Sequence, residues 1–132
     1  MKRGSAWWSL GGIMLALACG ARTPLVEVGP HPESGAPPIL VREPPPPTKV
    51  ETLPLRRDPE CFWRGGYWQP RGSAWTWVKG AWVRPEKGCR LAPAVTRFEA
   101  IEGSTVLVHR AELWYSTDPK QASCQPKDCS DF

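Results

Sequence analysis

Alternating apolar and polar residues, separated by turns that contain Pro or Gly, fill the chain between positions 61 and 116. Aromatic and β-branched residues are frequent in these segments, which favours strands over helices. The pattern predicts an all-β fold, a small twisted antiparallel meander of about four short strands connected as hairpins. The predicted strands lie near 61–69, 74–84, 90–99 and 104–116.

The first two predicted strands place tryptophans on both of their faces. Successive side chains of a strand point to opposite sides, so Trp77 and Trp82 fall on opposite faces, as do Trp63 and Trp68. A single sheet cannot bury both faces by itself. Either the sheet curls over and the tryptophans form the core of a small domain, or one face remains exposed as an aromatic platform.

The same two strands carry an internal repeat with a spacing of 14 residues. Its two full copies are Trp63-x-x-Gly66-x-Trp68 and Trp77-x-x-Gly80-x-Trp82. Two further copies have lost the tryptophans and place Ala94 and Ala111 at the glycine position. A glycine inside a strand leaves a gap in which an indole from the neighbouring strand can lie on the backbone.

The chain begins with a segment typical of bacterial export signals. Two basic residues stand at positions 2 and 3, and an apolar run occupies residues 6–18. This run is about as long as a signal-peptide core and shorter than the roughly 20 residues of a membrane-spanning helix. It ends in Leu-Ala-Leu-Ala, immediately before Cys19.

These residues resemble the lipobox of bacterial lipoproteins. In that family the cysteine thiol receives a diacylglycerol, the signal is cut before the cysteine, and the new amine is acylated by a fatty acid such as palmitate. The resemblance implies a signal peptide over 1–18 and a lipid anchor at Cys19, held by several acyl chains. Gly20, in place of aspartate, favours the outer membrane over the inner one. The alternative is an ordinary secretory signal that happens to contain a cysteine.

The segment after Cys19 is rich in proline up to residue 59 and includes the run from Pro44 to Pro47. Proline donates no backbone hydrogen bond and favours the polyproline II conformation, so residues 19–57 are predicted to be a disordered, extended and solvated linker. Its reach as a spacer is on the order of 100 Å. The alternative, a ligand for a proline-binding module, is less expected in a bacterial envelope.

The tryptophan repeats resemble the WxxGxW repeats, also written YxWGxW, of exported bacterial proteins, which are often lipoproteins with proline-rich leaders. Full copies of the motif cover residues 61–88, and degraded copies extend to about residue 114. The resemblance implies an architecture more than an activity. We therefore divide the chain into the signal peptide, the linker and a Trp-rich β domain over 58–132, which ends in a cysteine-containing tail.

Four cysteines remain besides Cys19, and they are Cys61, Cys89, Cys124 and Cys129. Export to an oxidising compartment and the even number predict two disulfides, with three possible connectivities. Cys124 and Cys129 enclose a short loop and could pair with each other. A four-cysteine zinc site is not favoured, because the chain lacks a Cys-x-x-Cys pair.

The charge of the chain excludes few classes of function. The net charge of +4 includes two residues of the signal, and residues 19–132 contain 15 basic and 13 acidic residues. This balance does not suggest a nucleic-acid partner. Seven basic residues and one acidic residue lie between Cys61 and Arg97, so a basic face for an anionic partner is one interpretation.

No arrangement of residues predicts catalysis. The chain has two histidines, His31 in the linker and His109 in the fourth predicted strand, where alternation with valines suggests a solvated or edge position. Paired histidines, a phosphate-binding loop and a Gly-x-Ser-x-Gly elbow are absent from the sequence. We therefore expect no enzymatic activity, no cofactor and no metal.

The sequence thus favours a non-catalytic envelope protein, held on the membrane by lipid and acting as a structural or interaction module. The alternative is a glycan- or peptidoglycan-binding module that stacks sugar rings on exposed aromatic residues. Either an envelope polysaccharide or a protein could be the partner. The residues of the candidate platform are Trp63, Arg64, Tyr67, Trp68, Trp75, Trp77, Lys79, Trp82 and Arg84.

Overall fold

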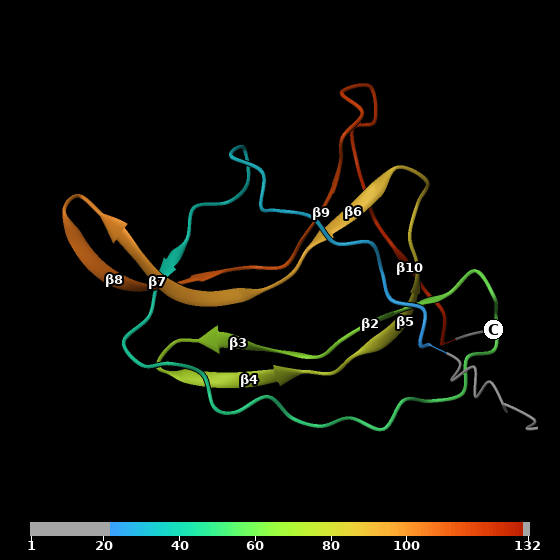
Figure 1. Cartoon of the computed structure of the whole chain (residues 1–132), viewed down its shortest axis with the longest axis horizontal. Coiled ribbons are helices and arrows are strands. Elements are labelled where there is room, and N and C mark those ends of the chain that lie inside the picture. Colours follow the sequence, from blue (N-terminus) through green and yellow to red (C-terminus); the bar gives the residue numbers. More distant parts are fainter. Residues whose placement is uncertain (1–21, 131–132) are drawn as a thin grey trace, which may run out of the picture.

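The computed structural model describes residues 22–130, and the regular secondary structure of this part is entirely β (Figure 1). The predicted all-β class with antiparallel strand pairing is confirmed. No helix among the described residues is long and apolar enough to cross a membrane. The predicted signal peptide and Cys19 lie outside the described residues. The ten strands described are β1 (Ile39–Leu40), β2 (Phe62–Arg64), β3 (Tyr67–Arg71), β4 (Ala74–Val78), β5 (Ala81–Arg84), β6 (Cys89–Ala92), β7 (Val95–Ile101), β8 (Ser104–Arg110), β9 (Leu113–Ser116) and β10 (Lys127–Asp128).

Each of the four predicted strands is divided into two short strands. The first hairpin pairs β3 with β4 at its tip and β2 with β5 at its base. The second hairpin repeats this arrangement, with β7 paired to β8 and β6 to β9. The interruptions include Gly66, Gly80, Ala94 and Ala111, the four positions that align with the glycine of the repeat.

Both hairpins turn tightly at residues with positive φ. Gly72 (φ 60°) lies in the turn between β3 and β4. Glu102 (φ 49°) and Gly103 (φ 81°) form the two-residue turn between β7 and β8. Two successive residues with positive φ give the twist that a two-residue hairpin needs.

The N-terminal residues 24–29 join the two hairpins at their bases. Pro24 O accepts a hydrogen bond from Trp63 N of β2 (2.8 Å), and Glu27 O accepts one from Leu91 N of β6 (2.9 Å). Between these contacts, Val26 is buried in a small core with Val83 and Leu91. This segment therefore links the sheet of the first hairpin to that of the second through two isolated bridges, Leu25–Trp63 and Val28–Leu91.

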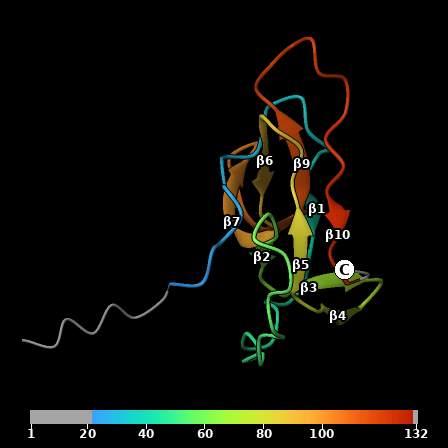
Figure 2. The same cartoon turned by 90° about the vertical axis from the view of Figure 1, so that its right-hand side faces the viewer.

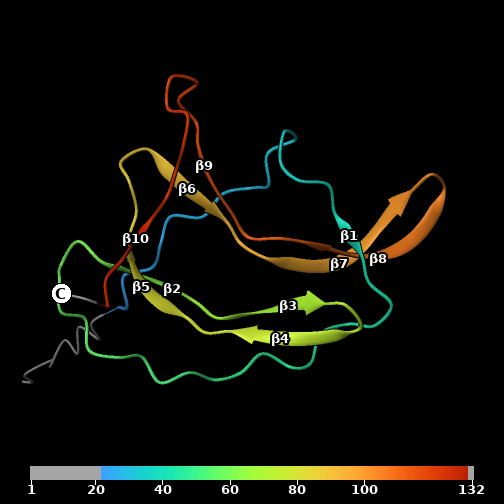
Figure 3. The same ribbon diagram turned by 180° about the vertical axis from the view of Figure 1, so that it is seen from behind.

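The proline-rich residues are extended, as predicted, but their contacts with the rest of the chain were not predicted. Strand β1 pairs with the outer edge of β8. Residues 43–57, which we call the strap, then run along the first hairpin on the side away from the second (Figures 1 and 3). We call residues 61–130 the body. The strap returns the chain to Cys61, where the body begins.

The predicted disulfide framework is present, with the pairs Cys61–Cys129 and Cys89–Cys124. Cys124 and Cys129 therefore do not pair with each other. All four cysteines are buried. The first disulfide fixes the C-terminal segment beside the first hairpin, where β10 pairs with β5 (Figure 2).

The expectation that His109 occupies a solvated or edge position is wrong. Its strand β8 is central, between β1 and β7, and the side chain is 1% exposed. Trp75 packs against the imidazole edge-to-face, with 5.8 Å between the ring centroids. A hydrogen bond joins His109 Nδ1 to Thr96 Oγ1 (2.9 Å), whereas Nε2 has no hydrogen-bond partner among the described residues.

We expect His109 to make the fold sensitive to mild acid. Burial lowers the pKa of His109 below its usual value of 6.5, with a smaller contribution from the charge of His31. The unfolded chain therefore binds a proton more readily, so stability falls as the pH drops below about 6.5. Urea unfolding followed between pH 7.5 and 5 should show this loss, and His109→Gln should reduce it. If the free energy of unfolding of the variant depends on pH as steeply as that of the parent chain, His109 is not the cause of the acid sensitivity.

Candidate functional site

The two full repeats pair with each other, so that their tryptophans form two cross-strand pairs. Trp63 lies opposite Trp82, and Trp68 lies opposite Trp77. The ring centroids are 5.3 Å apart in the first pair and 5.2 Å apart in the second, with interplanar angles of 67° and 69°. Both pairs thus have the edge-to-face geometry that aromatic rings prefer.

The first tryptophan of each repeat lies over the glycine of the other repeat. A Cβ atom at Gly66 would be 2.5 Å from Cζ2 of Trp77. A Cβ atom at Gly80 would overlap Cζ2 of Trp63. These contacts explain the spacing of the motif, because only glycine allows the indole to lie this close to the backbone.

The carboxylate of Glu51 in the strap lies at the centre of this arrangement. Gly66 N donates a hydrogen bond to Oε2 (3.2 Å), and Gly80 N donates to both carboxylate oxygens (3.0 and 3.1 Å). Trp77 Nε1 donates to Oε1 (2.9 Å). We call these three donors the carboxylate cradle. Its glycine N–H groups are at the interruptions between the short strands.

Two further indoles hold the strap on either side of Glu51. Trp68 Nε1 donates to Pro47 O (3.1 Å), and Trp82 Nε1 donates to Pro54 O (2.9 Å). The Nζ of Lys49 lies 5.1 Å from the centroid of the Trp68 ring, a cation–π distance. The second tryptophan of each repeat therefore binds a backbone carbonyl of the strap, while the two glycines bind its carboxylate.

The cradle favours the ionised form of Glu51. Desolvation opposes ionisation, but the hydrogen bonds from Gly80, Trp77 and Gly66 and the positive charge of Arg64 together hold the pKa below its usual value of 4.5. Hydrogen bonds to an ionised acceptor are stronger than those between neutral groups. At neutral pH the Glu51 side chain is therefore ionised, and in this form it holds the strap on the cradle.

The predicted assignment of faces is wrong for the tryptophans. Strict alternation places Trp77 and Trp82 on opposite faces, but both donate hydrogen bonds to the strap. The strand is interrupted between them, and the N–H of Gly80 points to Glu51. Trp63 is buried, whereas Trp68, Trp77 and Trp82 are half-buried beneath the strap. The tryptophans thus form a platform, and the chain itself covers it.

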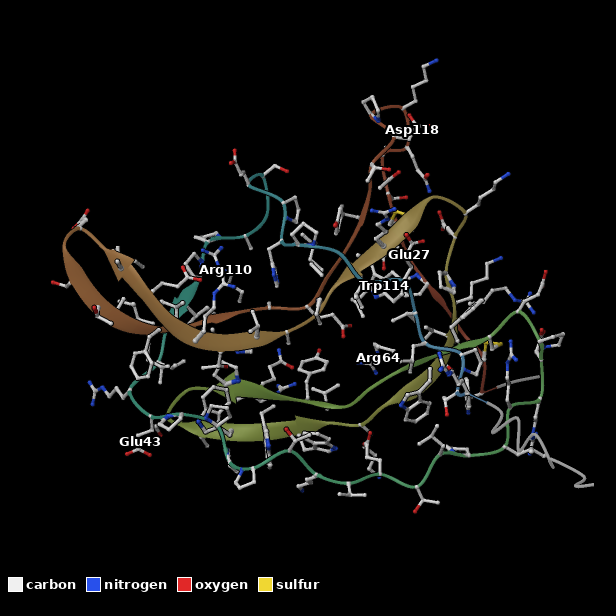
Figure 4. The ribbon with its side chains drawn as sticks, viewed as in Figure 1. Glu27, Glu43, Arg64, Arg110, Trp114 and Asp118 are labelled. Atoms are coloured by element: carbon white, nitrogen blue, oxygen red, sulfur yellow. A yellow bond between two sulfur atoms is a disulfide. The ribbon has the colours of Figure 1, made fainter. Side chains whose placement is uncertain are left out.

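The other residues of the predicted platform serve different contacts. Arg64 lies between the two hairpins (Figure 4), where it donates to Lys79 O (2.9 Å) and pairs with Glu112 (3.3 Å). Its guanidinium is 5.6 Å from the ring centroid of Tyr67. Arg84 pairs with Asp58 and Glu60. Trp75 packs against His109, away from the strap. Lys79 has an exposed side chain.

Glu51 is the residue that sequence reasoning missed. The proline-rich segment contains other glutamates, such as Glu33 and Glu43, and no local pattern distinguishes Glu51 from them. Figure 4 shows Glu43 at the start of the strap with its side chain directed away from the body. Only the fold reveals that Glu51 alone of these three reaches the glycines.

A cavity of about 340 Å³ adjoins one end of the platform. Its walls include Trp63, Trp82 and the Cys61–Cys129 disulfide, and Pro54 and Leu55 of the strap border it. Across residues 22–130, no group of three or more His, Cys, Asp or Glu side chains is arranged to hold a metal ion. Comparison with protein-family models, with curated proteins and with solved structures finds no match to this chain.

Proposed function

We propose that this chain is a non-catalytic, lipid-anchored protein of the bacterial envelope and that its paired WxxGxW repeats form an interaction module. The observation that carries the proposal is the contact between the platform and the strap. Indole and glycine N–H groups bind two backbone carbonyls and the carboxylate of Glu51 in an extended segment. This arrangement suits recognition of a chain, since it supplies hydrogen-bond donors on an aromatic surface.

The chemistry of the platform supports binding rather than catalysis. Its donors are backbone amides and indole N–H groups, which do not ionise near neutral pH and so cannot serve as general acids or bases. The ionisable group at its centre, Glu51, is engaged in three directions and held as a carboxylate. A carboxylate in this state holds the strap in place and is poorly suited to be a general base.

The proposed lipid anchor requires that Cys19 be covalently lipidated. Expressed in a Gram-negative host, the chain should incorporate an alkyne analogue of palmitate and fractionate with membranes. The Cys19→Ser variant should lose the label, because Cys19 is the cysteine that stands at the lipobox position. Cys61, Cys89, Cys124 and Cys129 are in disulfides and serve as internal controls. Equal labelling of the variant and the parent chain would contradict the anchor.

The alternative, a glycan- or peptidoglycan-binding module, gains support from the cavity beside Trp63 and Trp82. Its volume of about 340 Å³ is near the lower limit for small-ligand sites, and the aromatic walls suit a sugar ring. This alternative predicts that soluble peptidoglycan fragments protect tryptophan fluorescence from acrylamide quenching. Trp82→Phe should weaken the protection. If neither fragment nor quencher reaches the indoles, the strap excludes this class of ligand.

A further inference from the structure

The cradle and its flanking indoles form a recognition site whose present occupant belongs to the same chain. We infer that this site binds an extended, proline-rich peptide of a partner protein with one central carboxylate, and that the strap is an internal competitor for it. The inference rests on the proposed interaction function and names the class of its ligand.

The contacts of the strap define what the site reads. One carbonyl lies four residues before Glu51 and another three residues after it, and each accepts a hydrogen bond from an indole. The carboxylate accepts the remaining hydrogen bonds, from the cradle. A proline-rich backbone suits this spacing because it is extended and forms no internal hydrogen bonds, so its carbonyls remain free to accept.

Apart from Glu51 and from Lys49, whose ammonium group lies over the Trp68 ring, the site makes little use of the side chains of the strap. Val50, next to Glu51, is fully exposed, and Leu55 is 84% exposed. A site that reads two carbonyls and one carboxylate tolerates different residues between them. A segment of another protein that shares this outline would therefore fit the platform as the strap does.

The strap is also connected in a way that permits its release. Both disulfides lie within the body, and no disulfide joins the body to residues 22–60. The body therefore keeps its cross-links when the strap leaves. A tethered ligand has an effective local concentration on the order of millimolar, so an external peptide competes poorly until the strap is weakened.

The test uses the full mature chain with Cys19→Ser, disulfides intact, and a fluorescein-labelled peptide of residues 43–57. Fluorescence anisotropy should show that the Glu51→Ala protein binds this peptide at least tenfold more tightly than the parent protein. The Glu43→Ala protein is the matched control, because Glu43 lies in the same strap and points away from the body, and it should behave like the parent. Peptide with Glu51→Gln should bind at least tenfold more weakly, whereas peptide with Glu43→Gln should bind normally.

Equal binding of the unchanged peptide and its Glu51→Gln variant, or no gain in the Glu51→Ala protein, would overturn the inference. Trp77→Phe guards against a folding artefact. It keeps an aromatic side chain, removes one donor of the cradle and should weaken binding of the peptide to the Glu51→Ala protein. A concentration-dependent dimer of the parent chain that Glu51→Ala abolishes would assign the site to the strap of a second copy and overturn the choice of a separate partner. None of these outcomes depends on lipid labelling, so the anchor stands or fails separately.

Discussion

Loss of the Cys61–Cys129 disulfide should lower the free energy of unfolding by about 4 kcal/mol. The bond joins residues 68 apart in sequence, and the entropy of closing such a loop gives this magnitude. Small domains are stable by about 5–15 kcal/mol in total, so the Cys61→Ser/Cys129→Ser variant should be close to unfolding. The apolar core, built around Val26, Val83 and Leu91, is small and offers limited compensation.

The second disulfide provides the matched control. Cys89 and Cys124 are 35 residues apart, about half the first separation. Because the entropy of loop closure rises with the logarithm of length, the Cys89→Ser/Cys124→Ser variant should lose about 0.6 kcal/mol less. Urea unfolding followed by tryptophan fluorescence measures both. Losses below about 1 kcal/mol in both variants would show that the hairpins and strap hold the fold without cross-links.

Replacement of Gly80 by alanine should destabilise the chain by about 3 kcal/mol. The new Cβ would overlap the Trp63 ring and approach the carboxylate of Glu51, so the indole and the strap must both shift. Overpacking of this kind costs about 1–3 kcal/mol, and displacement of a charge-assisted hydrogen bond adds to it. Gly66→Ala should have a similar effect, because its Cβ would meet Trp77 in the equivalent way.

Gly65 is the control for this prediction, because it precedes Gly66 and a Cβ there would meet no atom within 4 Å. Gly65→Ala should therefore change the free energy of unfolding by no more than about 0.5 kcal/mol. Urea denaturation of all three variants separates crowding at the repeat glycine from a general effect of losing glycine. Equal losses for Gly65→Ala and Gly80→Ala would refute the role of the indole contact.

The class of the fold and the pairing of the hairpins could be predicted from local patterns. Alternation and turn residues locate the segments that pair, and turns such as Glu102–Gly103 limit the register. The interruptions could not be predicted in this way, because they depend on where the N–H groups of Gly66 and Gly80 find acceptors. Those acceptors lie on Glu51, 15 residues from the nearer glycine.

The candidate site was predicted in part. The repeat identified Trp63, Trp68, Trp77 and Trp82, which form two cross-strand pairs in the first hairpin. The occupant was not predicted, because polyproline composition predicts conformation and not contact. Nor was the burial of His109 predicted, since the alternation of β8 does not reveal that β1 covers its second edge. In each case the deciding interaction joins segments far apart in sequence.

If the chain is lipid-anchored as proposed, the backbone contacts of residues 24–29 with the two hairpins would limit the height of the body above a bilayer. Within residues 22–130, the first residue held by a backbone hydrogen bond to the body is Pro24, five positions after Cys19 in the sequence. Five extended residues span at most about 18 Å, far less than the reach of a free linker over 19–57. With Cys19 acylated as proposed, the body would rest at the headgroup surface, and its partners would have to approach within that layer. The prolines would thus keep the body low by wrapping it, where a free spacer would have raised it.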